Sequence, residues 1–283
     1  VGFSLLRHAS QVLPRTMALV VAPPALRLFD ALGFFDLGRL PNLVRPLATG
    51  RMIHRLGLAA DGAVPKAFAR LLRGLDRSGL GTLVGRAADA ALRWRAAAAR
   101  LRSMGLVTGA GEGAVVQAGE LDALWSSVRP ALGGAVVRDA CYLMSRYGAQ
   151  RPDSRYHWIT ARRDGLLTGV AILRSPAPSS DPRLAGLRIA VVADVLAAPA
   201  DRATMVALLG AVEHRAVALD ADALLGSASS PGVAAALRRQ AYWRVPANVH
   251  VLLRDVTGEA TRWRPVLADW WLTRGDSEAD FAF

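Results

Sequence analysis

The sequence predicts an α/β fold, and three observations in its second half support this fold class. Residues 187–196 are mostly apolar and rich in β-branched side chains, which is typical of a central strand covered on both faces. A short turn follows, and a helix begins at about Asp201 with apolar residues at 3.6-residue spacing. Asp164 and Gly165, between two alternating segments, predict a β-hairpin.

The first 47 residues predict the order helix, strand, helix, strand. Residues 2–13 have helical periodicity that ends before a proline, and the apolar segment 17–22 follows as a strand. The proline pair at 23–24 suits the start of a helix, and Gly33 suits its C-cap. The extended segment 34–46 completes the order.

The next segment has a different character, because it is rich in Arg and punctuated by Gly. Helical runs are predicted at about 65–76 and 84–104, and the Gly-rich stretch 105–113 is interpreted as a linker. We therefore expect residues 48–117 to be an Arg-rich helical connector.

The rest of the chain alternates helices and strands. Residues 120–147 are mostly helical with a break around 130–134, and the hairpin and the central strand with its helix follow. The last elements are a strand at 223–229, a helix at 233–240 and a strand at 248–254. Helices and strands that alternate in this way predict a sheet flanked by helices.

Composition limits what kind of protein this is. The chain has 283 residues and a formal charge of +12, but almost all basic residues are Arg, which indicates a compositional bias more than a nucleic-acid partner. The only cysteine, Cys141, lies in an apolar helical stretch and is expected to be a buried structural thiol. No apolar run is long enough for a membrane helix and no signal peptide is recognisable, so we expect a cytoplasmic protein. The chain starts at Val1, and we expect it to begin inside a longer protein.

Two segments repeat the same order of elements. The helix, strand, helix and strand of residues 2–46 correspond to those of 201–254, and each copy has a strand, a helix started by Pro and a closing aromatic pair. Two copies point to a duplicated domain whose first copy has lost its front half.

The order of elements and several short segments resemble the GNAT superfamily of N-acetyltransferases, and more narrowly the bacterial tandem-GNAT proteins. The segments that carry the resemblance are 138–147 (RDACYLMSRY), 271–277 (WLTRGDS) and the helix end 31–34 (ALGF). The resemblance implies a mixed, mostly antiparallel sheet flanked by helices. It also implies three parts: the C-terminal half of a first GNAT-like domain (1–47), the connector (48–117) and a second GNAT-like domain (118–283).

The resemblance further implies acyl transfer from acetyl-CoA, as co-substrate, to an amine acceptor. Tandem-GNAT proteins often occur near envelope or polysaccharide genes, so the implied acceptor is a small-molecule or sugar amine, such as an envelope or polysaccharide precursor. No metal is expected, since the His residues lack metal-ligand spacing. The sequence does not define an oligomeric state.

Candidate site residues follow from the strand, turn and helix at the centre of the chain. Free backbone N–H groups at a helix N-terminus can hold a phosphate, and an Asp in an apolar strand can act as a general base. We assign Asp194 as the candidate base, with the alternative that it caps a loop. The candidate cofactor residues are Leu196, Ala200, Asp201, Arg202 and Ala203. The candidate acceptor residues are Arg138, Asp139, Arg146 and Tyr147, which could equally form a structural ion-pair cluster. The acidic residues near the end of the sequence, Asp276, Glu278 and Asp280, are expected to be solvated.

The sequence also departs from the GNAT pattern. The segment 198–204 contains no Gly where the family's phosphate loop has it, and Asp201 would repel a pyrophosphate. The family's frequent general-acid Tyr corresponds to Phe29 in the first copy and Leu237 in the second, and neither can donate a proton.

Two functions therefore stay open. The order of elements favours an N-acyltransferase, and the altered loop favours a catalytically silent GNAT-like binding module that acts through its basic connector. Arg86, Arg93 and Arg100 recur every seven residues, and we expect residues 86–102 to offer a weak contact for an anionic surface, with a merely solvated helix as the alternative. No specific nucleic acid is expected.

Overall fold

A computed structural model describes most of the chain. The described residues are 13–19, 21, 23–58, 66–101, 109–112, 116–148, 155–179, 184, 186–247, 249–257 and 266–277. No helix among them is long and apolar enough to cross a membrane.

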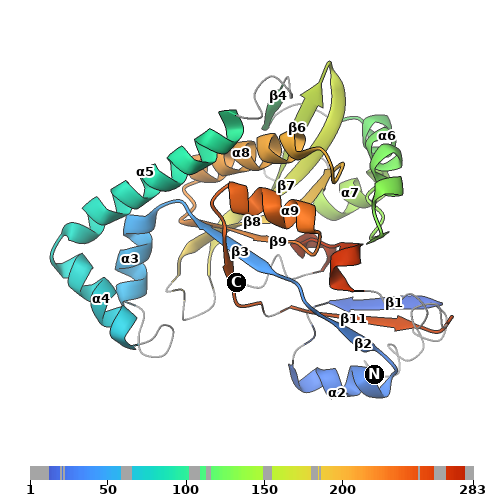
Figure 1. The fold of residues 1–283 in the computed structure, drawn as a ribbon, viewed down its shortest axis with the longest axis horizontal. Coiled ribbons are helices and arrows are strands. Elements are labelled where there is room, and N and C mark those ends of the chain that lie inside the picture. The colour runs from blue at the N-terminus through green and yellow to red at the C-terminus, as the bar shows by residue number, and fades with distance from the viewer. Residues whose placement is uncertain are drawn as a thin grey trace.

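A seven-stranded mixed sheet forms the centre of the molecule (Figure 1). All of its neighbouring strands are antiparallel except β8 and β9, which are parallel. In spatial order the strands are β10 (Trp243–Val245), β3 (Asn42–Pro46), β9 (Ala223–Ser227), β8 (Arg188–Ala197), β7 (Leu166–Pro178), β6 (Tyr156–Arg163) and β4 (Gly109–Glu112). The expected fold class, a mostly antiparallel sheet flanked by helices, is confirmed.

Helices cover both faces of this sheet. On one face, α8 (Arg202–Ala218) and α9 (Pro231–Arg239) share a hydrophobic core with the sheet. On the other face, α6 (Ala118–Val128) and α7 (Ala140–Tyr147) do the same. Burial on both faces explains why residues 187–196 lack an alternating pattern.

The hairpin between β6 and β7 follows the expected turn. Asp164 and Gly165 both have positive φ, 52° and 79°, as a two-residue turn between right-twisted strands requires. One expectation nearby is wrong: Gly109–Glu112, interpreted as part of a linker, pairs with β6 as the edge strand β4. A short Gly-rich segment can still pair at a sheet edge, where its low strand propensity is tolerated.

The Arg-rich segment forms three helices: α3 (Thr49–Leu58), α4 (Lys66–Arg77) and α5 (Leu80–Leu101). Both α4 and α5 pack on α3, and α5 also packs against α8. In Figure 1 these helices project from one side of the central sheet.

A second, three-stranded sheet combines two strands from the first 40 residues with one strand from residues 250–255. Its order is β1 (Arg15–Leu19), β11 (His250–Asp255), β2 (Phe35–Arg39), with the short η1 (Pro23–Ala25) and α2 (Leu26–Ala31) between β1 and β2 in sequence. The remaining small elements are η2 (Arg129–Ala131) and β5 (Gly134–Ala135) in the middle of the chain, and η4 (Leu267–Asp269), β12 (Trp270–Trp271) and η5 (Arg274–Asp276) toward its carboxyl end; β5 and β12 pair with each other.

The two sheets exchange strands. Residues 42–46, as β3, lie between β9 and β10, and residues 250–255, as β11, lie between β1 and β2. Each repeat thus places its last strand between two strands of the other, and Figure 1 shows blue β3 beside β9. Strands of residues 1–47 and 118–283 consequently share both sheets. The predicted division into residues 1–47, 48–117 and 118–283 stays a prediction.

Candidate functional site

The parallel strands β8 and β9 part at their carboxyl ends. Their pairing runs from Ile189–Ala223 to Val192–Gly226, whereas β8 continues to Ala197 along β7 alone. The register of β8 on β7 also shifts beside Asp194. The two strands thus lie side by side at their amino ends and separate toward their carboxyl ends.

The chain's own carboxyl-terminal segment fills this gap. We call Trp270–Asp276 the tail segment. The indole N–H of Trp271 donates to the carbonyl oxygen of Val195 on β8 (2.9 Å). On the other side, the backbone N–H of Ser229, just after β9, donates to the carbonyl oxygen of Leu272 (3.1 Å). The tail segment is therefore hydrogen-bonded to both parted strands.

A fully buried arginine fixes the tail segment to β8. Arg138 has no exposed surface, and its Nε donates to both carboxylate oxygens of Asp194 (2.9 and 3.1 Å). Its Nη2 donates to both oxygens of Asp276 (2.8 and 2.7 Å). Its Nη1 donates to the carbonyl oxygens of Val136 (3.0 Å) and Trp271 (3.4 Å). One guanidinium thus joins strand β8, the segment before α7 and the tail segment, and each of the two carboxylates receives a charge-assisted hydrogen bond from a different nitrogen.

Asp194 accepts three further hydrogen bonds within the protein. They come from Tyr147 Oη (3.3 Å), Thr273 Oγ1 (3.0 Å) and the backbone N–H of Val195 (2.8 Å). The side chain is only 2% exposed. Both oxygens of this carboxylate are therefore held by the chain itself. Its role as a general base stays a prediction, and the geometry gives it a structural role.

The predicted acceptor residues separate into two groups. Arg138 and Tyr147 meet at Asp194, whereas Asp139 caps α7 by accepting from the backbone N–H of Tyr142 (2.8 Å). Arg146 donates to the carbonyl oxygen of Ser277 (2.6 Å) and lies over the ring of Tyr147. Burial, and next the charge of Asp194, raise the pKa of Tyr147 above its ordinary value, so its hydroxyl stays protonated.

Two expectations about single side chains are wrong. Asp276 was expected to be solvated with the acidic end of the chain, but its carboxylate is completely buried against Arg138. Cys141 was expected to be buried, but it is exposed. It follows Ala140 at the start of α7, whose buried face is Ala140, Leu143 and Tyr147, and so it points away from the core. The other acids of the tail, Glu278 and Asp280, lie outside the described residues.

The amino end of α8 holds a carboxylate where a phosphate was expected. Asp201 is the N-cap, as predicted, and accepts from the backbone N–H of Thr204 (3.0 Å) and its hydroxyl (2.9 Å). Arg163 on β6 pairs with the same carboxylate (2.9 Å). Burial raises the pKa of Asp201, but these hydrogen bonds and Arg163 outweigh burial and lower it overall, so the carboxylate stays charged.

The other candidate cofactor residues do not form a cradle. Ala200 and Arg202 are exposed, while Leu196 and Ala203 are buried in the core. A charged Asp201 at the helix terminus repels a second anion, and the tail segment fills the gap that an extended cofactor would enter. These residues do not fit acetyl-CoA, and we derive no chemical step through it.

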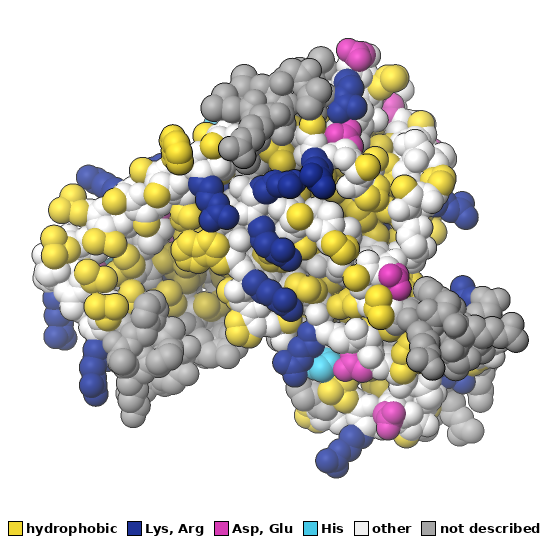
Figure 2. All heavy atoms as spheres, viewed as in Figure 1, with side chains coloured by type: hydrophobic (Ala, Val, Ile, Leu, Met, Phe, Trp, Pro, Cys, Tyr) yellow, Lys and Arg dark blue, Asp and Glu magenta, His cyan; other side chains and the backbone are white. Residues whose placement is uncertain are grey.

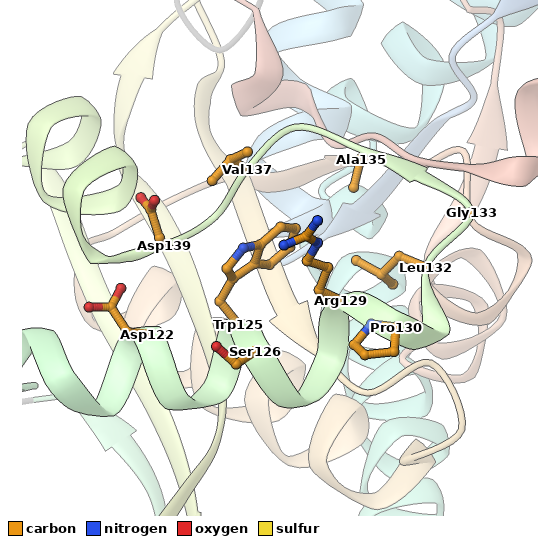
Figure 3. A pocket seen from close by; sticks show the side chains of 10 residues that line it. All are labelled: Asp122, Trp125, Ser126, Arg129, Pro130, Leu132, Gly133, Ala135, Val137 and Asp139. Atoms are coloured by element: carbon orange, nitrogen blue, oxygen red, sulfur yellow. The ribbon is translucent and has the colours of Figure 1, made fainter.

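Arg138, Asp194 and Tyr147, with the residues of the tail segment that contact them, form a buried cluster. An open cleft of about 860 Å³, lined in part by the neighbouring Asp139, lies beside this cluster (Figure 3). Asp122 and Asp139 lie at one end of it, and Trp125 and Arg129 lie farther along. Of the four predicted acceptor residues, Asp139 lines this cleft. Two carboxylates and an indole can attract a cation, although both carboxylates already accept backbone N–H groups at the start of α7.

Sequence reasoning missed two residues that complete the cluster, Thr273 and Asp276. Thr273 connects Asp194 to the tail, and its backbone N–H donates to Asp276 (2.7 Å). A signal was present, because both lie in the segment 271–277 that carries the family resemblance.

Comparisons with known proteins give weak likenesses. No protein-family model matches, and no curated protein sequence matches. The chain is similar to the crystal structure of a GCN5-related N-acetyltransferase from Anabaena variabilis ATCC 29413, with a TM-score of 0.49 and 10% identity. That match covers 90% of this chain but only 50% of the other one, so the chain spans half of that protein's length.

Two further structures are similar at lower scores. One is a GCN5-related N-acetyltransferase from Kribbella flavida, with a TM-score of 0.41 and 13% identity. The other is the C-terminal domain (DUF2156) of a putative lysylphosphatidylglycerol synthetase from Agrobacterium fabrum, with a TM-score of 0.37 and 14% identity. Each match covers 88% of this chain and 70% of the other. Likenesses of this strength carry no argument about function.

The buried carboxylate of Asp276 predicts an unusual pH dependence of the free energy of unfolding. Burial raises the pKa of Asp276, and the nearby Asp194 adds to this against the opposing effect of Arg138. The folded state therefore binds a proton more readily than the unfolded state, whose Asp has a pKa near 3.8. The contribution of Asp276 to the free energy of unfolding is present below about pH 4. It is lost as the pH rises through the folded-state pKa.

Urea unfolding between pH 4.5 and 7 checks the direction of this pH dependence. The parent chain should lose stability with rising pH relative to Asp276→Asn, which cannot titrate at this position. Asp30→Asn, at an exposed position, is the control and should keep the slope of the parent. Equal slopes for the parent and Asp276→Asn would contradict the raised pKa.

Proposed function

We propose that this chain is a GNAT-like binding module that does not transfer acyl groups at the gap between β8 and β9. The observation that carries the proposal is that the tail segment occupies this gap and hydrogen-bonds to both of its sides, through Val195 and Ser229. A pantetheine-like chain would compete for the same backbone groups. To enter, it would have to displace the buried contacts of Arg138 with Asp276.

Two further features support the same conclusion. Asp194, the acid placed within the central strand, is held by Arg138 and is not free to take a proton from an amine. Asp201, in its pair with Arg163, brings negative charge to the helix terminus where a pyrophosphate would have to bind. The binding role would then belong to other surfaces, among which the Arg-rich helices are the candidate.

Calorimetric titration with acetyl-CoA tests the proposal. We expect no saturable heat at acetyl-CoA concentrations up to about 1 mM, which corresponds to binding weaker than about −4 kcal/mol. Asp201→Asn and Arg163→Gln should behave like the parent, because the tail segment still fills the gap in both. Saturable binding that Asp201→Asn strengthens would overturn the proposal, since it would place an anion at the start of α8.

The second candidate function is an acyl-CoA-dependent N-acyltransferase. The observation that favours it is the parting of β8 and β9 itself, together with the adjacent cleft lined by Asp122, Trp125 and Asp139. Such a cleft suits an amine acceptor that arrives as a cation. A positive titration would make this the leading function. Loss of acyl transfer in Asp139→Asn, with acetyl-CoA binding unchanged, would then locate the acceptor.

A further inference from the structure

The long helix α5 carries apolar side chains on the side that faces away from the protein. Leu92 and Ala96 pack inward, with exposed fractions of 9% and 0%. Leu83 and Trp94 are exposed by 61% and 77%, and Leu80 and Val84 are exposed as well. At 3.6 residues per turn, Leu83 and Trp94 lie opposite Leu92, and Leu80 and Val84 continue this apolar surface to one side. Leu92 and Ala96 therefore belong to the packed face of α5, and a second apolar surface of the helix lies in solvent.

The apolar surface extends beyond α5. Trp94 and Val217 of α8, which is also exposed, line one shallow hollow between the two helices. On α4, Leu71 is 57% exposed. Figure 2 shows hydrophobic side chains gathered over the helices that project from the sheet, with Lys and Arg side chains around them. An exposed apolar area of this kind marks an interaction site.

The exposed charged side chains on the described parts of α4 and α5 are basic, although the buried Glu213 of α8 lines the hollow beside Trp94. Arg86 and Arg93 are exposed at one edge of the apolar face of α5, and Arg70 and Arg77 are exposed on α4. The sequences of α4 and α5 contain only two acidic residues, and both are turned toward α3. Asp76 pairs with His54 (2.9 Å), and Asp89 accepts from the backbone N–H and the hydroxyl of Thr49. The outward surface therefore presents apolar groups and positive charge.

We propose that the outward face of α5 docks on an anionic lipid bilayer, with the helix lying in the plane of the membrane surface. Leu80, Leu83, Val84 and Trp94 would enter the boundary between headgroups and acyl chains, and Arg86 and Arg93 would contact lipid phosphates. The helix of 22 residues is about 33 Å long, which gives a contact that extends over several lipids. It lies along the surface and does not cross the membrane.

The combination of features selects a bilayer over the other ligands of basic surfaces. A nucleic-acid backbone would use the Arg residues but would leave four large apolar side chains in water. A protein partner could cover the apolar face, but the surrounding positive charge would then need acids from that partner. An anionic bilayer can bury the apolar side chains and at the same time contact the Arg residues through its phosphates. The inference deepens the proposed binding role, and an acetyl-CoA titration and a vesicle experiment fail independently of each other.

Sedimentation with vesicles tests the apolar contact. The parent chain should bind phosphatidylglycerol-containing vesicles at low salt and should bind pure phosphatidylcholine vesicles at least tenfold more weakly. Leu83→Gln/Val84→Gln/Trp94→Gln should bind the anionic vesicles at least tenfold more weakly than the parent. The matched control is Leu166→Gln/Val256→Gln/Trp243→Gln, which changes the same residue types at exposed positions outside α4 and α5 and should bind as the parent does.

The charge contribution is tested separately. Arg86→Gln/Arg93→Gln should weaken binding by roughly fivefold per Arg at low salt, and this difference should shrink at physiological salt because the charges are screened. Arg27→Gln/Arg244→Gln removes the same charge from exposed positions elsewhere and should have no effect. Circular dichroism shows whether each variant is folded.

A spectroscopic readout fixes the orientation of the helix. Lipids brominated in their acyl chains should quench part of the tryptophan fluorescence of the parent, and Trp94→Phe should lose that quenching while it still binds. The proposal is overturned if the parent does not bind the anionic vesicles, if the apolar triple variant binds as well as the parent, or if Trp94→Phe is quenched as strongly. It is also overturned if the apolar triple variant converts a self-associated parent to a monomer, because the face would then be an interface between copies.

Discussion

Arg138→Met is expected to lower the free energy of unfolding at neutral pH by about 3–5 kcal/mol. The substitution leaves the carboxylates of Asp194 and Asp276 buried, with exposed fractions of 2% and 0%, after their shared cation is removed. A buried charge without its partner costs far more than the pair contributes, so the loss exceeds that of an ordinary substitution. Thermal unfolding should show a melting temperature lower by roughly 10 °C.

The pH dependence of this variant separates charge from packing. Without Arg138 the pKa of Asp276, which burial already raises, should rise further, so protonation at mild acidity removes its uncompensated charge. The difference between parent and variant should therefore shrink from pH 7 to pH 5. Arg129→Met removes an exposed arginine nearby and should change stability by less than about 0.5 kcal/mol. A loss below about 1 kcal/mol in Arg138→Met, or a loss independent of pH, would contradict the proposed electrostatic role.

Gly275→Ala is expected to displace the tail segment and to cost about 2–3 kcal/mol or more. A Cβ atom at this position would lie 2.7 Å from the carbonyl oxygen of Ala193 on β8 and still closer to the hydroxyl of Tyr147. The first contact is with backbone in the middle of the sheet, which cannot move aside. The tail must shift instead, and its shift weakens the contacts of Asp276 with Arg138.

Gly119→Ala provides the matched control. Gly119 lies in the first turn of α6, and nothing lies within 4 Å of the position its Cβ would take. Ala is a better helix former than Gly, so this variant should be equal to the parent or slightly more stable, by up to about 1 kcal/mol. Urea unfolding of both variants checks the comparison. Parent-like stability in Gly275→Ala would mean that the tail segment does not hold the gap as tightly as described.

Patterns within a few neighbouring residues predicted the central strand, the hairpin turn and the helix N-cap. The apolar run at 187–196 could only be a covered strand, and Asp164-Gly165 adopts positive φ at both positions. Asp201 is the N-cap that its short acceptor side chain favours. In each case the information lies within a few residues of the feature. Local spacing also contained the information for Cys141, whose predicted burial was wrong: Ala140, Leu143 and Tyr147 define a buried face of α7 that excludes it.

Features that depend on distant partners could not be predicted in this way. An apolar alternating strand reveals which of its faces is buried but not which strand lies beside it, so β3 and β11 could have paired within their own repeats. Asp276 was expected in water because carboxylates near a chain end usually are. Its burial depends on Arg138, which lies 138 residues away in the chain, and no short-range pattern connects the two.

The exchange of strands also affects how the protein is made. Asn42 of β3 and Ser227 of β9, which pair in the central sheet, are 185 residues apart. At typical rates of synthesis the ribosome needs roughly 10–40 s to cover that distance, during which β3 has no partner. The three-stranded sheet closes later still, because β1 pairs with residues up to Asp255. Neither sheet can complete its pairing until residues 223–255 have been translated, and strands that wait unpaired for so long are prone to aggregate.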